Sequence, residues 1–335
     1  MSTEGSTDAA AAERARKATS GLVRRVLIGA VLGAFVFAGF SLYADVDALR
    51  HNLSRFAWPS FGLAVILATA NYALRYVRWQ YYLTQLDVRV PHGTSALIFL
   101  SGFVMSVTPG KLGEVLKSLL LYEERGVSIA RTAPVVIAER LTDLIALVLL
   151  TAVGSLAFEG GAPIAAVGAG AAGFVLLACS VRAIGELLLG IAARLPLIRR
   201  IEPRLREAYE SLYLLSRPAP LGLATALATA SWFLECVALW VIVSGLDAPP
   251  LSLAASSFAY AASTVVGALA MMPGGLGVTE AGMTGLITSL SDGTIDTSAA
   301  TAATLLCRLA TLWWAVVVGA VALAWLRARK ASSRA

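Results

Sequence analysis

The sequence has few charged residues, few histidines and few cysteines. Charged residues make up 14% of the 335 residues, against about 25% in a soluble domain, which excludes an ordinary soluble protein. The two histidines, His51 and His92, lie far apart and leave almost no room for histidine-based metal or base chemistry. The cysteines, Cys179, Cys236 and Cys307, lie in apolar segments. They are typical of small buried residues rather than of a disulfide set or a metal cluster.

Motifs of catalysis and nucleotide binding are also missing. The sequence contains no Gly-x-Ser-x-Gly, no P-loop, no His-Glu-x-x-His and no Cys-x-x-Cys. The glycine-rich stretch 160–173 lies in and before an apolar run, so it does not resemble a nucleotide-binding loop. We therefore expect no enzymatic activity, no metal, no cofactor and no nucleic-acid partner.

What the sequence has instead is long apolar runs. It is 58% hydrophobic with a mean hydropathy of +0.75, which predicts one all-α polytopic membrane domain over residues 26–326. About 20 apolar residues are needed to cross the hydrocarbon core. Six segments meet this requirement: roughly 26–44, 61–83, 134–158, 163–181, 220–244 and 299–325.

Two stretches carry the same helix-breaking pattern, Pro-Gly-x-Leu-Gly. They are Thr108-Pro-Gly-Lys-Leu-Gly-Glu114 and Met272-Pro-Gly-Gly-Leu-Gly-Val278. The apolar segments on either side of each break are short for a full span. We therefore predict two re-entrant helical hairpins, at about 94–122 and 252–290, each buried in protein or lining a wet cavity.

Positive charges in the loops predict the orientation. The basic tails 1–25 and 327–335 are placed in the cytoplasm, the first of them disordered or lying on anionic lipid. The arginine-rich connector 183–215 also falls inside, as an amphipathic helix or as a solvated linker. Loops 159–162 and 245–251 contain no Lys or Arg and fall outside. The hairpins then open to opposite faces, which predicts an inverted repeat in the plasma membrane.

Charged residues inside apolar segments are the candidate functional groups. Each costs at least about 2.5–3.5 kcal/mol at the bilayer centre, so its retention needs a reason. They are Lys111, Glu114, Lys117, Glu139, Arg140, Asp143, Glu235, Glu280 and Arg308.

Two arginines follow the two breaks at similar distances. Arg140 lies 31 residues after Pro109, and Arg308 lies 35 residues after Pro273. Arg140 shares a helix face with Asp143 and is expected to pair with it, unless the cluster is an interfacial one that reaches toward headgroups. Arg308 is expected either to pair with a carboxylate such as Glu280 or Glu139 or to bind a phosphate or carboxylate ligand.

Each half-helix that starts at a Pro-Gly directs free backbone N–H groups and a positive dipole end toward the protein centre. With the two arginines, these ends predict an anion site, and the glycines allow close backbone approach. The predicted substrate-binding residues are Pro109, Gly110, Gly113, Glu114, Glu139, Arg140, Asp143, Pro273, Gly274, Gly275, Gly277, Glu280 and Arg308. Arg75 and Arg78, beside several aromatic residues, are predicted as an interfacial belt or as headgroup contacts.

The same motifs resemble those of a known family. The segments Pro109–Glu114, Glu139–Asp143, Pro273–Gly277 and Glu280–Gly282, with the basic-aromatic stretch from Asn71 to Trp79, resemble the flippase-like family of the lysylphosphatidylglycerol synthase transmembrane region. The resemblance covers about residues 20–325 and implies a multi-pass protein that moves a lipid between leaflets. The chain stops soon after Trp325, where full synthases carry a soluble transferase domain, so synthase activity is not implied.

These observations predict a lipid flippase or transporter whose partners are membrane lipids. One alternative is a non-catalytic membrane scaffold for enzymes of lipid or glycolipid synthesis. Another is a membrane enzyme that modifies a lipid headgroup with Glu139 or Asp143 as acid or base. The sequence does not name the lipid or the oligomeric state.

Overall fold

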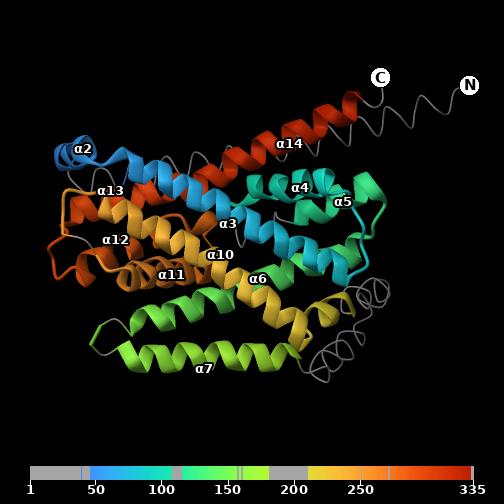
Figure 1. Ribbon diagram of the computed structural model, residues 1–335, viewed down its shortest axis with the longest axis horizontal. Coiled ribbons are helices and arrows are strands. Elements are labelled where there is room, and N and C mark those ends of the chain that lie inside the picture. The colour runs from blue at the N-terminus through green and yellow to red at the C-terminus, as the bar shows by residue number, and fades with distance from the viewer. Residues whose placement is uncertain are drawn as a thin grey trace, which may run out of the picture.

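In the computed structural model the chain forms a helical bundle (Figure 1). The structure describes a large part of the sequence, and no strand occurs there. The described residues are 39, 46–107, 115–156, 158–159, 161–180, 210–249, 251–270 and 272–332.

The helices have the following bounds. In the first part of the chain they are α2 (Val46–Arg55), α3 (Trp58–Gln85), α4 (His92–Ser101), the short η1 (Gly102–Met105), α5 (Leu116–Arg125), α6 (Ile129–Ser155) and α7 (Gly161–Ser180). In the second part they are α10 (Pro218–Ser244), α11 (Leu253–Leu269), η3 (Pro273–Gly275), α12 (Val278–Leu290), α13 (Thr297–Arg308), the π-helical turn η4 (Leu309–Trp313) and α14 (Trp314–Ser332).

Five of the six predicted spans correspond to observed helices, namely α3, α6, α7, α10 and the run from α13 to α14. Three of these helices are both long and apolar enough to cross a membrane: Trp58–Gln85, Pro218–Ser244 and Thr297–Lys330. The all-helical membrane fold class is therefore confirmed. The number of spans and the re-entrant character of the two predicted hairpins stay predictions.

Several predicted regions lie wholly or mostly outside the described residues. They are the tail 1–25, the first predicted span 26–44, most of the connector 183–215, and the break that contains Pro109, Gly110, Lys111, Gly113 and Glu114. Of the connector, the described part from residue 210 to 215 is helical. Of the C-terminal tail, residues 327–332 belong to α14.

The second predicted break is visible at Pro273. Helix α11 starts after Ser252, whose hydroxyl accepts a hydrogen bond from the backbone N–H of Ala255 at 3.1 Å, and it ends at Leu269. Gly274, Gly275 and Gly277 then adopt φ angles of 61°, 71° and 84°, a left-handed conformation that favours glycine. The chain thereby reverses, and α12 packs back against α11.

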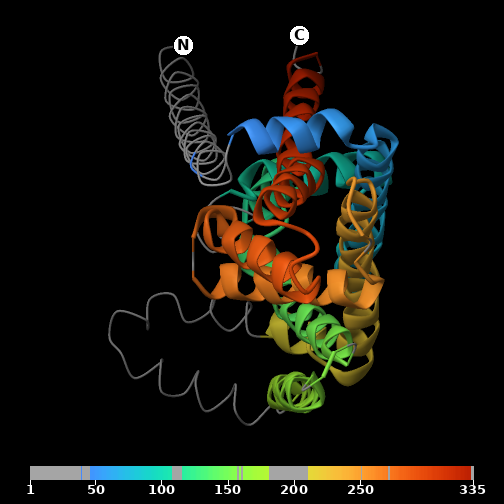
Figure 2. The same ribbon diagram turned by 90° about the vertical axis from the view of Figure 1, so that its left-hand side faces the viewer.

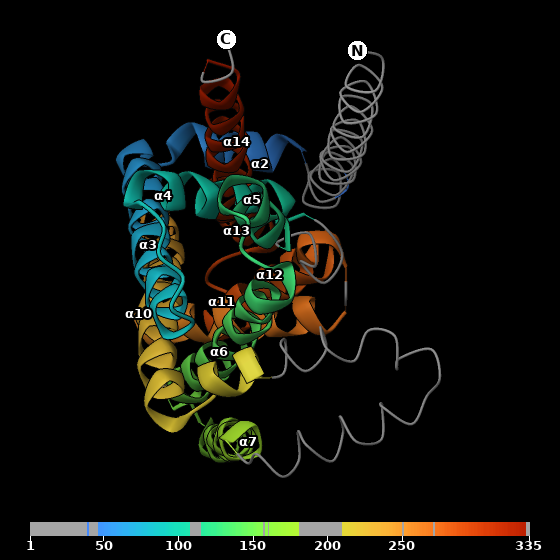
Figure 3. The same ribbon diagram turned by 90° about the vertical axis from the view of Figure 1, so that its right-hand side faces the viewer.

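Helices α3 and α10 lie side by side along their lengths, at one side of the bundle (Figures 1 and 3). The long helix that follows each predicted hairpin packs on the hairpin of the other part: α6 contacts α11, and α14 contacts α4 and η1. Helix α7 lies at the edge of the molecule against α6 (Figure 2). This exchange of contacts ties the two parts of the chain together.

Candidate functional site

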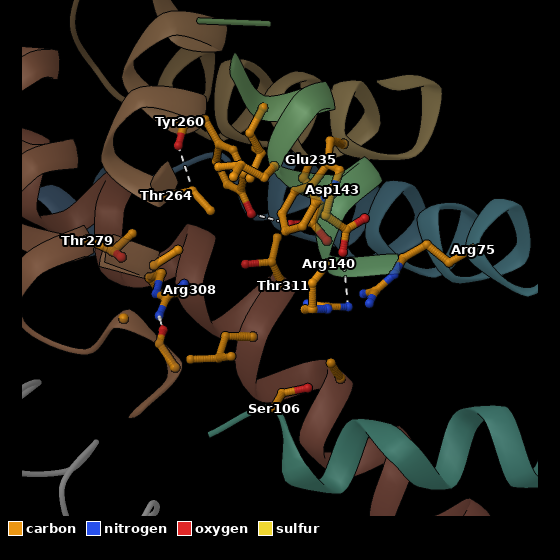
Figure 4. A pocket seen from close by; sticks show the side chains of 18 of the residues that line it. Arg75, Ser106, Arg140, Asp143, Glu235, Tyr260, Thr264, Thr279, Arg308 and Thr311 are labelled. Carbon is orange, nitrogen blue, oxygen red and sulfur yellow. Dashed lines mark hydrogen bonds and ion pairs between the residues drawn. The ribbon is translucent and has the colours of Figure 1, made fainter. Parts of the chain in front are cut away.

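A cavity of about 290 Å³ lies where α3, α6, α10, α11 and α13 meet. Three arginines line it, each from a different helix: Arg75 from α3, Arg140 from α6 and Arg308 from α13 (Figure 4). Two carboxylates, Asp143 and Glu235, line the same cavity. The structure therefore brings together charged groups that are more than two hundred residues apart in the sequence.

Arg308 is held by the break that precedes α12. Its Nε lies 2.6 Å from Glu280 Oε1, and its Nη2 donates to the carbonyl oxygen of Gly274 at 2.5 Å. The arginine is 6% exposed and the glutamate is fully buried. The ion pair to Glu280 that the sequence offered as one alternative is therefore present. Arg308 lines the cavity nonetheless, so the pair fixes the guanidinium at the cavity wall.

The start of α12 is capped by the same glutamate. The second carboxylate oxygen of Glu280, Oε2, accepts a hydrogen bond from the backbone N–H of Gly277 at 2.6 Å. The side chain thus satisfies an N–H of the helix start that the sequence analysis had expected to face a ligand. Gly274, Gly275 and Thr279 line the cavity, whereas Pro273, Gly277 and Glu280 are not among its lining residues.

Asp143 is shared by two arginines. Its Oδ2 lies 3.0 Å from Arg140 Nη2, and its Oδ1 lies 2.7 Å from Arg78 Nη1. The expected pairing within α6 is therefore confirmed. Helix α6 begins at Ile129, five residues before the predicted span, so Arg140 lies about 16 Å along the helix at 1.5 Å per residue. Both residues line the cavity, and whether they lie near the membrane interface stays a prediction.

Arg75 and Arg78 differ although they are neighbours on α3. Arg78 is fully buried, donates to Thr142 Oγ1 at 3.0 Å as well as to Asp143, and does not line the cavity. Arg75 lines the cavity and lies over the ring of Phe103, with 5.0 Å between the guanidinium carbon and the ring centroid. Neither arginine is part of an exposed interfacial belt, since Arg75 is only 8% exposed.

Glu139 does not reach the cavity. It forms an ion pair with Lys117 of α5, and both side chains are almost completely buried. The ammonium of Lys117 also lies 4.9 Å from the ring centroid of Trp79 and 5.5 Å from that of Phe99. This pair fastens α5 to α6 and places Glu139 in a structural position.

Glu235, a charged residue inside an apolar segment, was not among the predicted substrate-binding residues. Its carboxylate lines the cavity and accepts a hydrogen bond from the hydroxyl of Tyr260 on α11 (Figure 4). Tyr72 and Trp232 line the cavity beside it, and Tyr72 donates to the carbonyl oxygen of Thr311 at 3.1 Å. The sequence signal for Glu235 was a single glutamate within an apolar segment, but no motif linked it to the three arginines that line the cavity.

Part of the cavity wall is apolar and exposed. Leu269 is 71% exposed and Met272 is 47% exposed, and both line the cavity at the end of α11. Exposed leucine and methionine beside buried arginines give the cavity one polar part and one part suited to hydrocarbon. An amphiphile fits both parts better than a small soluble ion does.

In the described part of the chain, no group of three or more His, Cys, Asp or Glu side chains is placed to hold a metal ion. Pro109, Gly110, Gly113 and Glu114 lie outside that part, so the contribution of the first break to the site stays a prediction.

Comparison with known protein families gives a match. No curated protein matches the chain. Residues 25–319 match the family described as the lysylphosphatidylglycerol synthase TM region, as the resemblance in the motifs predicted. Since this match extends over most of the sequence, the chain belongs to the family of the lysylphosphatidylglycerol synthase transmembrane region, and so to the membrane proteins of lipid handling.

Proposed function

We propose that the protein moves a lipid headgroup between the two leaflets of the membrane, as a flippase or transporter. The observation that carries the proposal is the cavity. Three buried or half-buried arginines line one part of it, and exposed apolar side chains line another. Guanidinium groups bind phosphate bidentately, and the apolar part suits the acyl chains that remain in the bilayer.

The packing of the helices supports an inverted repeat. The order α3, α4, α5, α6 in the first part corresponds to α10, α11, α12 and α13–α14 in the second. Under this correspondence α6 packs on α11 while α14 packs on α4, and α3 packs on its own counterpart α10. Reciprocal contacts of this kind are what a two-fold axis between equivalent units requires.

Individual residues agree with the same correspondence. Asn71 and Ser231 occupy the same place in α3 and α10 (58 to 71 and 218 to 231), and Asn71 Nδ2 donates to the Ser231 carbonyl oxygen at 2.7 Å. A Cβ on Gly154 of α6 would lie 2.9 Å from backbone atoms of α11. A Cβ on Gly319 of α14 would lie 2.4 Å from the backbone N of Val104. Each long helix thus uses a glycine to approach the opposite hairpin closely.

Each half contains a buried ion pair between its hairpin and the following helix, and the acidic and basic residues exchange places between the halves. In the first half the second helix of the hairpin contributes Lys117 and the following helix contributes Glu139. In the second half the hairpin contributes Glu280 and the following helix contributes Arg308. Only the second pair places its cation at the cavity. The two halves therefore share the same order of helices, but they do not contribute equally to ligand binding.

In this proposal the halves rock about the α3–α10 contact and expose the cavity to each leaflet in turn. The absence of nucleotide-binding motifs in the sequence leaves an ion gradient or a lipid concentration difference as the energy source. The protein resides in the plasma membrane with both termini in the cytoplasm, and its partners are lipids. The substrate passes through chemically unchanged.

The experiment is a flipping assay in proteoliposomes of phosphatidylethanolamine and phosphatidylglycerol with identical acyl chains. Outer-leaflet ethanolamine is measured with an impermeant amine reagent, and outer-leaflet glycerol headgroups are measured with periodate. Wild type is compared with protein-free vesicles, with Arg308→Ala and with Arg55→Ala, an exposed arginine on α2 that does not line the cavity. A charge-assisted contact contributes about 1.5–3 kcal/mol, so we expect Arg308→Ala to slow flipping roughly tenfold or more.

Flipping by Arg308→Ala at the wild-type rate would refute the role of Arg308 in transport. Wild-type vesicles no faster than protein-free ones would refute transport itself and favour a scaffold for lipid-synthesis enzymes. A changed headgroup in the lipid extract after incubation would favour the enzyme alternative. Size-exclusion profiles of each variant show that it remains folded.

A further inference from the structure

We propose that the π-helical turn η4 (Leu309–Trp313) is a joint at which α13 turns relative to α14, and that this movement takes Arg308 to and from the cavity wall. Tyr72 and Trp314 hold the joint in the form that the structure contains. The inference rests on the proposed transport and adds to it the moving part that assembles the site.

One helical run packs on both halves of the chain. Residues Thr297–Lys330 form a single run long enough to cross a membrane, which consists of α13, η4 and most of α14. Helix α13 packs on α12 of the second hairpin, whereas α14 packs on α4 and η1 of the first. In the proposed transport the halves rock against each other, so this run has to bend between the two contacts.

The π-helical turn lies between those two contacts. The backbone N–H of Trp314 donates to the carbonyl oxygen of Leu309, five residues earlier, where an α-helix would use the residue four earlier. Such a turn holds one extra residue and is a known cause of kinks. The run contains no proline, and its one glycine, Gly319, lies against the backbone of Val104 in η1. The turn is therefore the place where the run bends most easily.

The residue directly before the turn is Arg308. Its Nε lies 2.6 Å from Glu280 Oε1, and its Nη2 donates to the carbonyl oxygen of Gly274, so the guanidinium is fixed to the second hairpin. Arg75 and Arg140 reach the cavity from α3 and α6 instead. When α13 turns at η4 together with the second hairpin, Arg308 moves away from the other two arginines. The cavity then loses one of the three cations that make it suited to an anion.

The turn also forms part of the cavity wall. Thr311 and Leu312 line the cavity, and a Cβ on Gly274 would lie 3.3 Å from Leu312 Cδ2, so the turn contacts the second break. Successive residues differ by about 100° around a helix, so a change of winding by one residue takes a side chain off the face that it occupies. Movement in the turn therefore changes the lining of the cavity directly.

Two side-chain hydrogen bonds join the turn to α3. The Tyr72 hydroxyl donates to the carbonyl oxygen of Thr311 at 3.1 Å, and Trp314 Nε1 donates to Thr69 Oγ1 at 3.0 Å. The ring of Tyr72 also packs on Phe103 of η1, with 4.8 Å between the ring centroids. Tyr72 thus contacts both the turn and the first hairpin. A single neutral hydrogen bond adds only a modest net stability, so this clamp is reversible.

The test measures distances between pairs of spin labels in the proteoliposomes described above. One pair, at Thr297→Cys and Ala328→Cys, spans the turn, and both positions are exposed. The control pair, at Gly93→Cys and Ala328→Cys, joins α4 to α14, which pack on each other. We expect two distances for the first pair, about 5 Å or more apart, the scale of one helical turn, and one distance for the control pair. The native cysteines are replaced with alanine in every labelled protein: Cys179, Cys236 and Cys307.

Two variants weaken the clamp. Tyr72→Phe removes the hydroxyl and keeps the ring, and Trp314→Phe removes an N–H from a residue that is not among those lining the cavity. Each loses one hydrogen bond, so we expect each to change the ratio of the two distance populations about two- to tenfold. The matched control is Tyr76→Phe, which removes a hydroxyl that donates to the His92 carbonyl oxygen at 3.1 Å, one turn further along α3. It is expected to keep the wild-type ratio.

The outcomes separate this inference from the proposed function. A single distance across the turn, the same in wild type and in both clamp variants, would overturn the joint even where the vesicles flip lipid. Two distances in vesicles that flip no lipid would keep the joint and refute transport. Equal movement of the control pair would place the bend outside η4 and overturn the inference. Tyr76→Phe changing the ratio as much as Tyr72→Phe does would overturn the role of the clamp.

Discussion

The ion pair between Glu280 and Arg308 should be the strongest polar interaction that holds the second hairpin. Replacing either residue with Gln removes a charge and leaves its partner ionised inside the protein. Both groups are almost completely buried, with 2.6 Å between Arg308 Nε and Glu280 Oε1. Removing one partner of a buried pair costs about 3–5 kcal/mol, so each single variant should lower the free energy of unfolding by that order.

The double variant Glu280→Gln/Arg308→Gln should lose much less than the sum of the single losses. Neither partner then remains as an isolated charge, and the difference is the coupling energy between the two side chains. We expect a coupling of about 2–3 kcal/mol, near the upper end of the range for residues in direct contact. The measurement is unfolding in mixed micelles of increasing denaturing-detergent content, followed by tryptophan fluorescence.

The chain offers a matched control in the pair between Arg55 and Asp247. Arg55 Nη1 lies 2.7 Å from Asp247 Oδ2, nearly the distance of the buried pair, but the side chains are 59% and 62% exposed. An exposed pair contributes about 0.2–1 kcal/mol, so its coupling should be several times smaller. Equal coupling energies for the two pairs would refute the conclusion that the buried pair stabilises the break at Pro273. Losses of unfolding free energy that simply add at Glu280 and Arg308 would refute it as well.

Three further outcomes follow from the structure. Gly275→Ala should destabilise the break, because the φ of Gly275 is 71° and a new Cβ would lie 2.4 Å from Thr279 Oγ1. Gly285→Ala, in open space on α12, is the control and should be tolerated. The measurement is thermal unfolding of both variants in detergent. Arg78→Ala should lower the free energy of unfolding by about 3 kcal/mol, since it leaves a carboxylate that the guanidinium contacts at 2.7 Å, and a melting temperature unchanged from wild type would contradict this. An impermeant maleimide added to intact cells should label Glu159→Cys but not Arg125→Cys if the predicted orientation holds, and the reverse pattern would invert it.

Local patterns were sufficient for the class of fold and for many of the element bounds. Runs of about 20 apolar residues predicted helices that the structure contains, because hydrophobic length is a property of one segment. The Pro-Gly pattern predicted the break that the structure places at Pro273, because proline and left-handed glycines disrupt a helix wherever they stand. The pair of Arg140 with Asp143 was predictable for the same reason, since residues three apart share a helix face.

Contacts between helices were not predictable in this way. Arg75 and Arg78 appear alike in the sequence, yet one lines the cavity and the other is locked to α6. Glu280 was expected only as one possible partner of Arg308, and the structure gives it that pair together with the cap of α12. Nothing in the spacing indicated that Glu139 would pair with Lys117 rather than reach the site.

The sequence by itself determined that this is a helical membrane protein of a lipid-handling family, broken at Pro273 and carrying charges that an apolar segment does not normally keep. Only the tertiary structure decided which of those charges meet one another and which line the cavity. The physical reason is that hydropathy and helix-breaking residues act within a segment. The partner of a buried charge is chosen by the packing of α3, α6, α10 and α13 around a common cavity.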